Sequence, residues 1–255
     1  MTKPAYGSSV HYLGREGEDY FHRYGRLGAI NGEINAHKFR HLVQQTDTVL
    51  DFGCGGGDLL RALDCSRRIG VEINPAARRH CAESGIECYE DLTAIADNVA
   101  DIVISNHVLE HVPYPIEALR QLRSKLKPGG TLTICVPIDD WRSQKRYGPE
   151  DRNHHLHTWT VPLLGHSLSE AGFSVEDITM VTHAWPRGYQ HLYRRLPLFW
   201  FNLACTAWAA LTRRRQLLAV ARPARKRPGI SSRSSTTWAE SGKTASLQEV
   251  TDGED

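Results

Sequence analysis

The chain contains 255 residues, of which 40% are hydrophobic and 24% are charged, and its formal net charge at pH 7 is +2. This composition is typical of one globular domain with appendages, and the absence of a basic, aromatic-rich stripe gives no case for a nucleic-acid partner. The six cysteines are scattered without a CxxC pair, and the N-terminus is polar. These features predict a cytoplasmic protein with reduced thiols rather than a secreted disulfide framework.

The chain order predicts three parts. Residues 1–45 form an N-terminal segment, which is loose up to residue 19 and continues as an amphipathic helix over Tyr20–Gln45. That helix either caps a bound ligand or merely covers one face of the sheet. Residues 46–223 form the main domain, and residues 224–255 are polar and predicted to be disordered.

The strongest local signal is the stretch Val49-Leu-Asp-Phe-Gly-Cys-Gly-Gly-Gly-Asp58. An apolar run leads into Asp51, glycines follow, and leucines then recur at helical spacing, which predicts a buried strand, a tight turn and a helix start. Because glycine has no Cβ, a ligand can approach the main-chain N–H groups of such a turn. The carboxylate at the strand end favours a ligand with hydroxyl or ammonium groups over a phosphate.

Six further strands are predicted, at Arg68–Glu72, Ile86–Tyr89, Ala100–Asn106, Thr131–Val136, Ser174–Val181 and Gln216–Ala221. Strands alternate with helices up to Val136, which requires parallel pairing through right-handed crossovers. Ligands of such sheets bind at the carboxyl ends of the strands, where the strand order reverses. Asp51, Glu72, Asp91 and Asn106 all fall at strand ends, so we expect them to meet at one site.

Three motifs combine here: Asp51-x-Gly53-x-Gly55-x-Gly57, Glu72 after the second strand, and Leu126-Lys-Pro-Gly-Gly130 before the fifth. As a set they resemble the class I S-adenosylmethionine-dependent methyltransferases. The segments 155–159 and 168–173 are similar to a bacterial small-molecule branch of that family. The resemblance implies an α/β fold with a doubly wound, seven-stranded, mostly parallel Rossmann-like sheet, whose last strand is antiparallel and whose two faces carry helices.

The resemblance also implies S-adenosyl-L-methionine as the cofactor and assigns its contacts. Asp51 would hold the amino end of the methionine moiety, Glu72 the ribose hydroxyls, and Asp91 the exocyclic amine of adenine. The full set of implied cofactor-binding residues is Asp51, Gly53, Gly55, Gly57, Glu72, Ile73, Asp91, Leu92, Asn106 and His107.

The predicted reaction is in-line attack of a small, hydroxylated or lipid-linked acceptor on the sulfonium methyl group. A neutral hydroxyl is a poor nucleophile and needs a base, and histidine suits proton transfer at neutral pH. The candidate catalytic residues are His107, His111, His155 and His157, and Asp139 and Asp140 are further candidates for the base.

No metal is predicted. His107-Val-Leu-Glu-His111 matches the H-x-x-E-H pattern of some zinc proteases, but it follows a central strand directly, and Pro113 and Pro115 cut the helix short. The run from His154 to His157 could offer a pair of imidazoles as metal ligands. No third ligand follows at a spacing typical of a metal site.

Other functions fit less well. A nicotinamide or flavin site needs Gly-x-Gly-x-x-Gly/Ala, and neither frame of the glycine turn provides it because Asp58 or Leu60 takes the last position. A protein or nucleic-acid methyltransferase is disfavoured because no Asn-Pro-Pro-Tyr-like tetrad follows the fourth strand. The main alternative is a cofactor-binding or scaffold protein of the same fold that transfers nothing.

The segment 196–211 is apolar and is flanked by Arg194-Arg195 and by arginines at 213–215. Sixteen residues of helix extend about 24 Å, which is too short for a bilayer core. The first prediction is a lid or buried helix. The alternative is an interfacial helix that contacts the inner face of a membrane, in which case the acceptor is lipid-linked.

Overall fold

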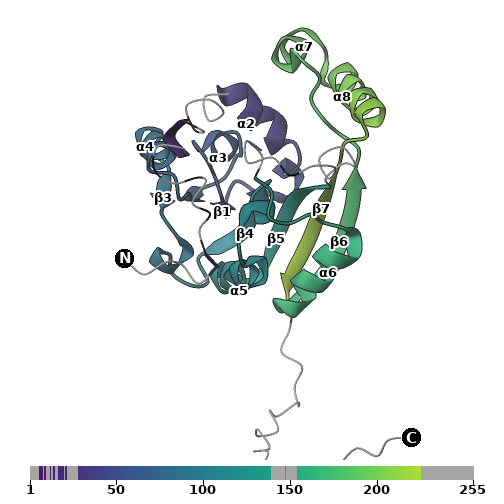
Figure 1. The fold of residues 1–255 in the computed structure, drawn as a ribbon. Coiled ribbons are helices and arrows are strands. Elements are labelled where there is room, and N and C mark those ends of the chain that lie inside the picture. Colours follow the sequence, from purple (N-terminus) through teal and green to yellow (C-terminus); the bar gives the residue numbers. More distant parts are fainter. Residues whose placement is uncertain are drawn as a thin grey trace, which may run out of the picture. The chain divides into compact units, whose positions relative to one another are not determined.

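The structure is a computed structural model that describes residues 6, 7, 9, 12, 14, 17–19, 21, 28–138, 147 and 154–224. Its centre is a seven-stranded sheet with the order β3-β2-β1-β4-β5-β7-β6 (Figure 1). The strands are β1 (Thr48–Phe52), β2 (Arg67–Val71), β3 (Glu87–Tyr89), β4 (Ala100–Asn106), β5 (Leu126–Ile138), β6 (Phe173–Val181) and β7 (Arg215–Pro223). The helices are α2 (Gly28–Ala36), α3 (Asp58–Arg61), α4 (Pro75–Glu83), α5 (Pro115–Lys125), α6 (Val161–Glu170), α7 (Tyr189–Arg195) and α8 (Leu198–Thr212).

The pairing of the strands confirms the predicted fold class. The strands from β1 to β5 pair in parallel, whereas β7 runs antiparallel to both β5 and β6. From β1 the chain builds outward to β2 and β3, then returns to place β4 on the other side of β1. The strand order therefore reverses between β1 and β4, which is where such sheets bind ligands.

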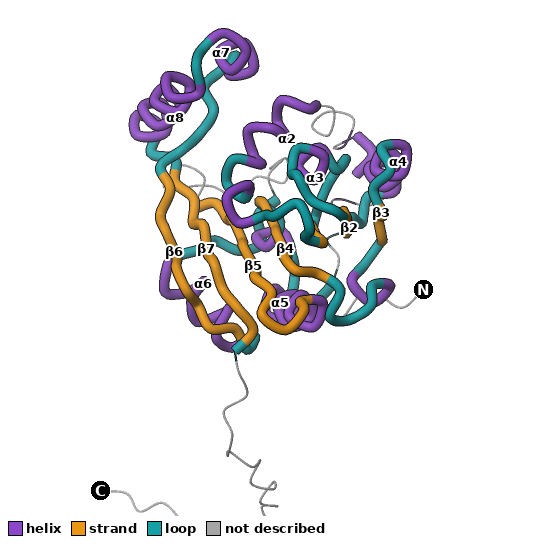
Figure 2. The backbone as a smooth tube through the Cα atoms, turned by 180° about the vertical axis from the view of Figure 1, so that it is seen from behind, coloured by secondary structure: helices purple, strands orange, loops and turns teal. Residues whose placement is uncertain are grey.

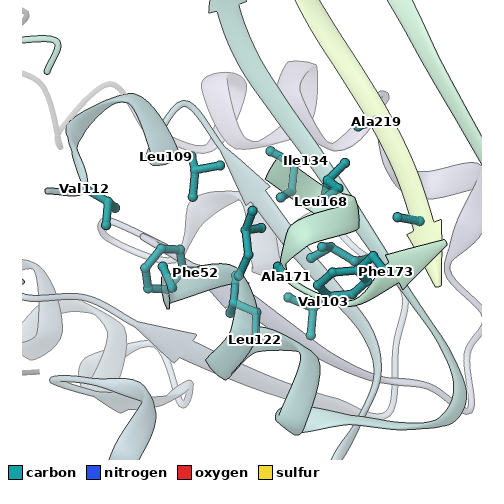
Figure 3. Close-up of a cluster of buried hydrophobic side chains, with 14 of the residues drawn as sticks. Phe52, Val103, Leu109, Val112, Leu122, Ile134, Leu168, Ala171, Phe173 and Ala219 are labelled. Atoms are coloured by element: carbon teal, nitrogen blue, oxygen red, sulfur yellow. The ribbon is translucent and has the colours of Figure 1, made fainter. Parts of the chain in front are cut away.

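The core lies on both faces of the sheet because alternate residues of the central strands point to opposite sides. On one face Leu50 and Val103 pack with residues of α5 and α6, as Figure 3 shows for Val103, Leu122 and Leu168. On the other face Val49 and Ile104 pack with residues of α3 and α4. Helices thus cover both faces, as the resemblance implied.

The N-terminal region departs from the single helix predicted for Tyr20–Gln45. Within the described residues α2 ends at Ala36, a short 3-10 turn covers Arg40–Leu42, and the chain is extended at Val43. Phe39, between these two elements, is fully buried in the core of the α3 face. The chain bends here so that Phe39 can reach that core, and tertiary packing overrides the helical periodicity.

The helices α7 and α8 form an excursion between β6 and β7 (Figures 1 and 2). Phe201 and Cys205 of α8 are fully buried with Ile34 of α2, so α8 is anchored on the N-terminal segment. No helix among the described residues is long and apolar enough to cross a membrane. Residues 225–255, predicted to be a disordered tail, lie outside the described part of the chain.

Candidate functional site

A cavity of about 420 Å³ lies at the carboxyl ends of the central strands. Its walls come from the strand ends and the turns that follow them, from α2 and the residues before it, from Ala77 of α4 and from Trp185. The residues that line it include Tyr12, Gly53, Gly55, Glu72, Asn106 and His111. A second hollow of about 170 Å³ adjoins the glycine turn and shares Gly53, Gly55 and Asn106 with the first.

The glycine turn is open to the cavity at one residue in particular. Gly55 has φ +52°, and a Cβ placed on it would meet nothing within 4 Å. A Cβ on Gly53 would lie 2.2 Å from Val108, and one on Gly57 would lie 2.4 Å from Ile86. Glycine is therefore required at 53 and 57 by packing, while Gly55 leaves free space that a ligand can use. Gly57 lines neither hollow and is the N-cap residue of α3.

Glu72 follows β2 directly and faces the turn. Its carboxylate accepts hydrogen bonds from the main-chain N–H of Gly55 at 2.9 Å and from that of Asn74 at 2.8 Å. Burial raises the pKa of this carboxyl group, while the two N–H donors counteract that effect. Glu72 and its neighbour Ile73 both line the larger cavity, where the predicted ribose contact requires them.

Replacing Glu72 with alanine is expected to weaken S-adenosylmethionine binding at least tenfold. The change removes the acceptor for the vicinal hydroxyls and also the bond that holds Gly55, and tenfold corresponds to about 1.4 kcal/mol. Isothermal calorimetry measures this directly. Glu87→Ala is the matched control, since Glu87 lies on the adjacent strand β3 in an exposed ion pair with Arg67. Unchanged affinity in Glu72→Ala, with circular dichroism showing a folded chain, would contradict the assignment.

Asp51 lies at the bottom of the smaller hollow. It is 2% exposed, and its Oδ1 has no hydrogen-bond partner. Burial, with the negative charge of Glu72, raises the pKa of Asp51 to about 8. An unpartnered buried carboxyl oxygen beside an open glycine turn fits the ammonium group of a methionine moiety, which would satisfy it.

This pKa predicts proton release on cofactor binding. At pH 7 the free carboxyl group is mostly protonated, and a bound cation favours the ionised form, so about one proton should leave per cofactor bound. Calorimetry at pH 7 in two buffers with different ionisation enthalpies measures this number. The release should be lost in Asp51→Asn, and equal heats in both buffers for the natural sequence would argue against the assignment.

The structure places Asp91 and Leu92 differently from the cavity residues. Neither lines the two hollows. The Asp91 carboxylate accepts from the main-chain N–H of Thr93 at 2.6 Å and from its hydroxyl, which caps a 3-10 turn over Leu92–Ala94. Leu92 is fully buried in the core. The predicted contacts of these two residues with adenine remain predictions.

Asn106 and His107 end β4 at the cavity and belong to a polar network that sequence inspection missed. Lys38 donates to Asn106 Oδ1 at 2.9 Å and to Gln216 Oε1 at 3.1 Å, and His107 Nε2 lies 3.2 Å from the same Gln216 oxygen. His107 has φ +58°, a left-handed conformation that is strained outside glycine and asparagine. Lys38 and Gln216, from two distant parts of the chain, thus hold the end of β4.

A buried carboxylate stands between two of the candidate histidines. Glu110 is fully buried, and neither of its oxygens has a hydrogen-bond partner, although Oε1 lies 3.5 Å from His107 Nδ1 and 3.9 Å from His111 Nε2. Burial alone lowers the pKa of His107, but interactions with Cys135 and Glu110 outweigh it and raise that pKa to about 9. His107 is therefore an imidazolium at neutral pH, paired with Glu110.

The pKa of His111 is shifted in the opposite direction from that of His107. Burial lowers its pKa below the usual value of histidine, so this side chain is a neutral imidazole at pH 7. Its Nδ1 lies 2.8 Å from the hydroxyl of Tyr12 and 3.3 Å from the carbonyl oxygen of His154. Because both Tyr12 and His111 line the larger cavity, the structure brings a neutral base to its wall.

The remaining candidates are more distant from the cavity wall. His155 packs edge-on against His111 with 4.9 Å between ring centroids, and His157 donates from Nε2 to the carbonyl oxygen of Val112 at 2.9 Å. Neither lines the cavity. Asp139 and Asp140 lie outside the described residues. Ligand atoms of Glu110, His111 and His155 lie within 4.8 Å of one another, so these three could hold a cation; the prediction of no metal stays untested.

Several cavity residues carried no sequence signal. Tyr6, Ser9 and Tyr12 come from the segment predicted to be loose, and Tyr6 is in fact 2% exposed and packs on Phe52. Asn31, Asn35 and Trp185 also line the cavity, from α2 and from the chain before α7. The two asparagines lie four residues apart on one helix face, which is the one pattern that could have indicated a capping role for α2.

Comparisons with known proteins agree with this geometry. Residues 18–178 match the family described as Methyltransferase domain. A ubiquinone biosynthesis O-methyltransferase of Xanthomonas campestris pv. campestris is 38% identical over 103 residues, which are 34% of this chain and 42% of that protein. One of Xanthomonas euvesicatoria pv. vesicatoria is 29% identical over 163 residues, 54% of this chain and 67% of that protein. The chain therefore spans less than half the length of the first of these relatives.

Solved structures show the same fold at low identity. A chain of the Haloferax volcanii complex between the Trm112 methyltransferase activator and the putative methyltransferase matches with a TM-score of 0.59 and 18% identity, covering 84% of this chain and 100% of that one. Phosphoethanolamine N-methyltransferase 2 of Haemonchus contortus, solved with S-adenosylhomocysteine, matches with a TM-score of 0.52 and 15% identity, covering 76% and 53%. The [4+2]-cyclase SpnF matches with a TM-score of 0.53 and 22% identity, covering 77% and 81%.

Proposed function

The chain belongs to the methyltransferase-domain family, as an S-adenosylmethionine-dependent enzyme, and we propose that its acceptor is a hydroxyl group of a small, lipid-linked molecule. The observation that carries this proposal is the neutral imidazole of His111 on the wall of the cavity. The O-methyltransferase names of the relatives support a hydroxyl acceptor. When bound, S-adenosylmethionine supplies an electrophilic methyl group on a sulfonium centre.

The residues of this chain then have distinct tasks. Asp51 and Glu72 hold the two polar ends of the cofactor, with Gly55 leaving room between them. His111 removes the proton of the acceptor hydroxyl, directly or through the Tyr12 hydroxyl 2.8 Å from its Nδ1. Glu110 lies 3.9 Å from His111 Nε2 and stabilises the imidazolium that forms. Orientation of the acceptor and the cofactor within the cavity supplies the remaining acceleration.

The lipid-linked character of the acceptor is inferred from α8. Its outer side exposes Phe199 at 69%, Trp200 at 55% and Leu211 at 78%. Arginines stand at both ends of α8, at 194–195 and 213–215. An apolar surface with tryptophan and flanking arginines suits the boundary of an anionic membrane. We infer that α8 contacts a lipid surface and that the acceptor is taken up there.

Two measurements test the proposal. Transfer of labelled methyl from S-adenosylmethionine to a panel of phenols and catechols with and without an isoprenoid tail should yield product, and the tailed members should react faster. Sedimentation with anionic liposomes should deplete the protein, and Trp200→Glu with Phe199→Glu should prevent this without loss of cofactor binding. Turnover confined to untailed acceptors, together with no co-sedimentation, would leave a small-molecule methyltransferase and refute the lipid link.

The second candidate is a cofactor-binding protein that transfers no methyl group. The matching structure named a [4+2]-cyclase favours it, because that name shows that this fold is compatible with another reaction. The discriminating observation is formation of S-adenosylhomocysteine. Stoichiometric binding without that product, across the acceptor panel, would support the second candidate.

A further inference from the structure

Three cysteines from separate elements meet beneath the glycine turn. Cys54 stands in the turn between Gly53 and Gly55, Cys81 is near the end of α4, and Cys88 is in the middle of β3. The Sγ of Cys54 lies 3.8 Å from that of Cys81 and 3.7 Å from that of Cys88. All three sulfur atoms lie within 4.8 Å of one another. The proposed methyl transfer uses none of these thiols.

The surrounding backbone leaves room for this cluster. A Cβ on Gly70 of β2 would lie 2.5 Å from the Cys54 sulfur and 3.3 Å from that of Cys88. Glycine in the middle of a buried strand weakens it, so its presence marks a place where other atoms approach closely. Here the atoms that approach are two of the three sulfurs.

A fourth donor atom faces the same space. The carbonyl oxygen of Gly55 lies 3.2 Å from the Cys81 sulfur and 3.6 Å from the Cys54 sulfur. Zinc binds thiolates at about 2.3 Å in a tetrahedron, which puts neighbouring sulfurs roughly 3.8 Å apart. The sulfur–sulfur distances of 3.8 Å and 3.7 Å match that spacing before any rearrangement.

We propose that Cys54, Cys81 and Cys88, with the Gly55 carbonyl oxygen, bind a thiophilic divalent cation of the zinc group. Each ligating thiol releases its proton to solvent as its sulfur bonds the metal, and no redox change is involved. Cys54 and Cys81 are buried, whereas Cys88 is partly exposed and offers the entry path. Since Cys54 and Gly55 belong to the turn, the cation would brace the main chain of the glycine turn.

Access to the cluster differs among the three thiols. Cys54 and Cys81 are buried, and Cys88 is partly exposed. The Cys88 sulfur would therefore be the first ligand of an arriving cation.

The test is a titration of the reduced, metal-free full chain with Co²⁺ as a spectroscopic probe. We expect one equivalent to produce a thiolate-to-cobalt charge-transfer band, one equivalent of Zn²⁺ to remove it, and Mg²⁺ to produce none. Cys88→Ser should weaken binding at least tenfold. Cys65→Ser is the matched control, because Cys65 is also buried but lies outside the cluster. His155→Ala should keep the band, which separates this site from the cluster around Glu110.

Absence of the band, or an unchanged band in Cys88→Ser, would overturn the proposal. If Cys88→Ser does not fold, alkylation of the unaltered chain gives an independent answer. Zn²⁺ should protect Cys88 from a small alkylating reagent, and equal labelling with and without Zn²⁺ would refute the site. Neither readout involves methyl transfer, so a failure here is distinguishable from a failure of the proposed function.

Discussion

Replacing Gly55 with valine is expected to abolish S-adenosylmethionine binding, with a loss of more than a hundredfold in affinity. Gly55 is the one residue of the turn whose Cβ position is open, so a valine side chain would enter the space that the cofactor needs. The residue also has φ +52°, a conformation that costs a branched side chain about 1–3 kcal/mol. Calorimetric titration with the cofactor gives the affinity directly.

The matched control for this change is Gly129→Val. Gly129 also has a positive φ, +84°, and a Cβ there would likewise meet nothing within 4 Å. Gly129 lies in β5 and lines neither hollow. Its carbonyl oxygen accepts a hydrogen bond from Arg222. Both variants should lose similar thermal stability, and only Gly55→Val should lose binding. A normal binding curve for Gly55→Val would mean that the cofactor does not approach this turn.

Replacing His111 with glutamine is expected to lower kcat by 10²–10⁴-fold while leaving cofactor affinity within threefold. This range is the usual contribution of a positioned general base, and His111 is the neutral imidazole on the wall of the cavity. His166→Gln is the control, since His166 is exposed on α6. A fall in kcat shared by both variants, or lost cofactor binding in His111→Gln, would point to a structural role.

The pH profile distinguishes His111 from His107. A base must be deprotonated to act, so kcat should rise with pH through the pKa of His111 and then level off. That pKa is lowered by burial, which places the rise below pH 6.5. Were His107 the base, the rise would extend to about pH 9, where its pKa lies. A single rise near pH 9 in the natural sequence would reassign the base.

Much of the cofactor-binding region, from Val49 to Val136, could be predicted from sequence because its signals are local. The glycine turn, the carboxylates after β1 and β2, and the alternation of strands and helices each depend on residues close in the chain. The structure brings Asp51, Gly55 and Glu72 to adjoining hollows, as that pattern indicated. The sequence did not indicate where the side chains of Asp91 and Leu92 lie. The Asp91 side chain caps a 3-10 turn, and the Leu92 side chain is buried in the core.

The arrangement of the candidate catalytic residues depends on contacts between residues far apart in the chain. Four histidines were equal candidates in the sequence, and burial and neighbours separate them. Cys135 and Glu110 raise the pKa of His107 to about 9, whereas burial lowers the pKa of His111. Lys38 and Gln216 join the end of β4 across 178 residues, a contact that no periodicity encodes. The segment expected to be loose supplies Tyr12 to the same wall.

The sequence by itself determined the class of the protein: a doubly wound sheet with a strand–glycine turn–helix that takes a cofactor bearing hydroxyl and ammonium groups. The positions of the glycines, the acidic residues at strand ends and the spacing of hydrophobic residues each depend on the local backbone. They can therefore be interpreted one segment at a time. Only the tertiary structure decided the charge state of each histidine, the origin of the cavity wall and the meeting of Cys54, Cys81 and Cys88. Those properties arise from desolvation and from contacts between distant segments, which exist only once the chain has folded.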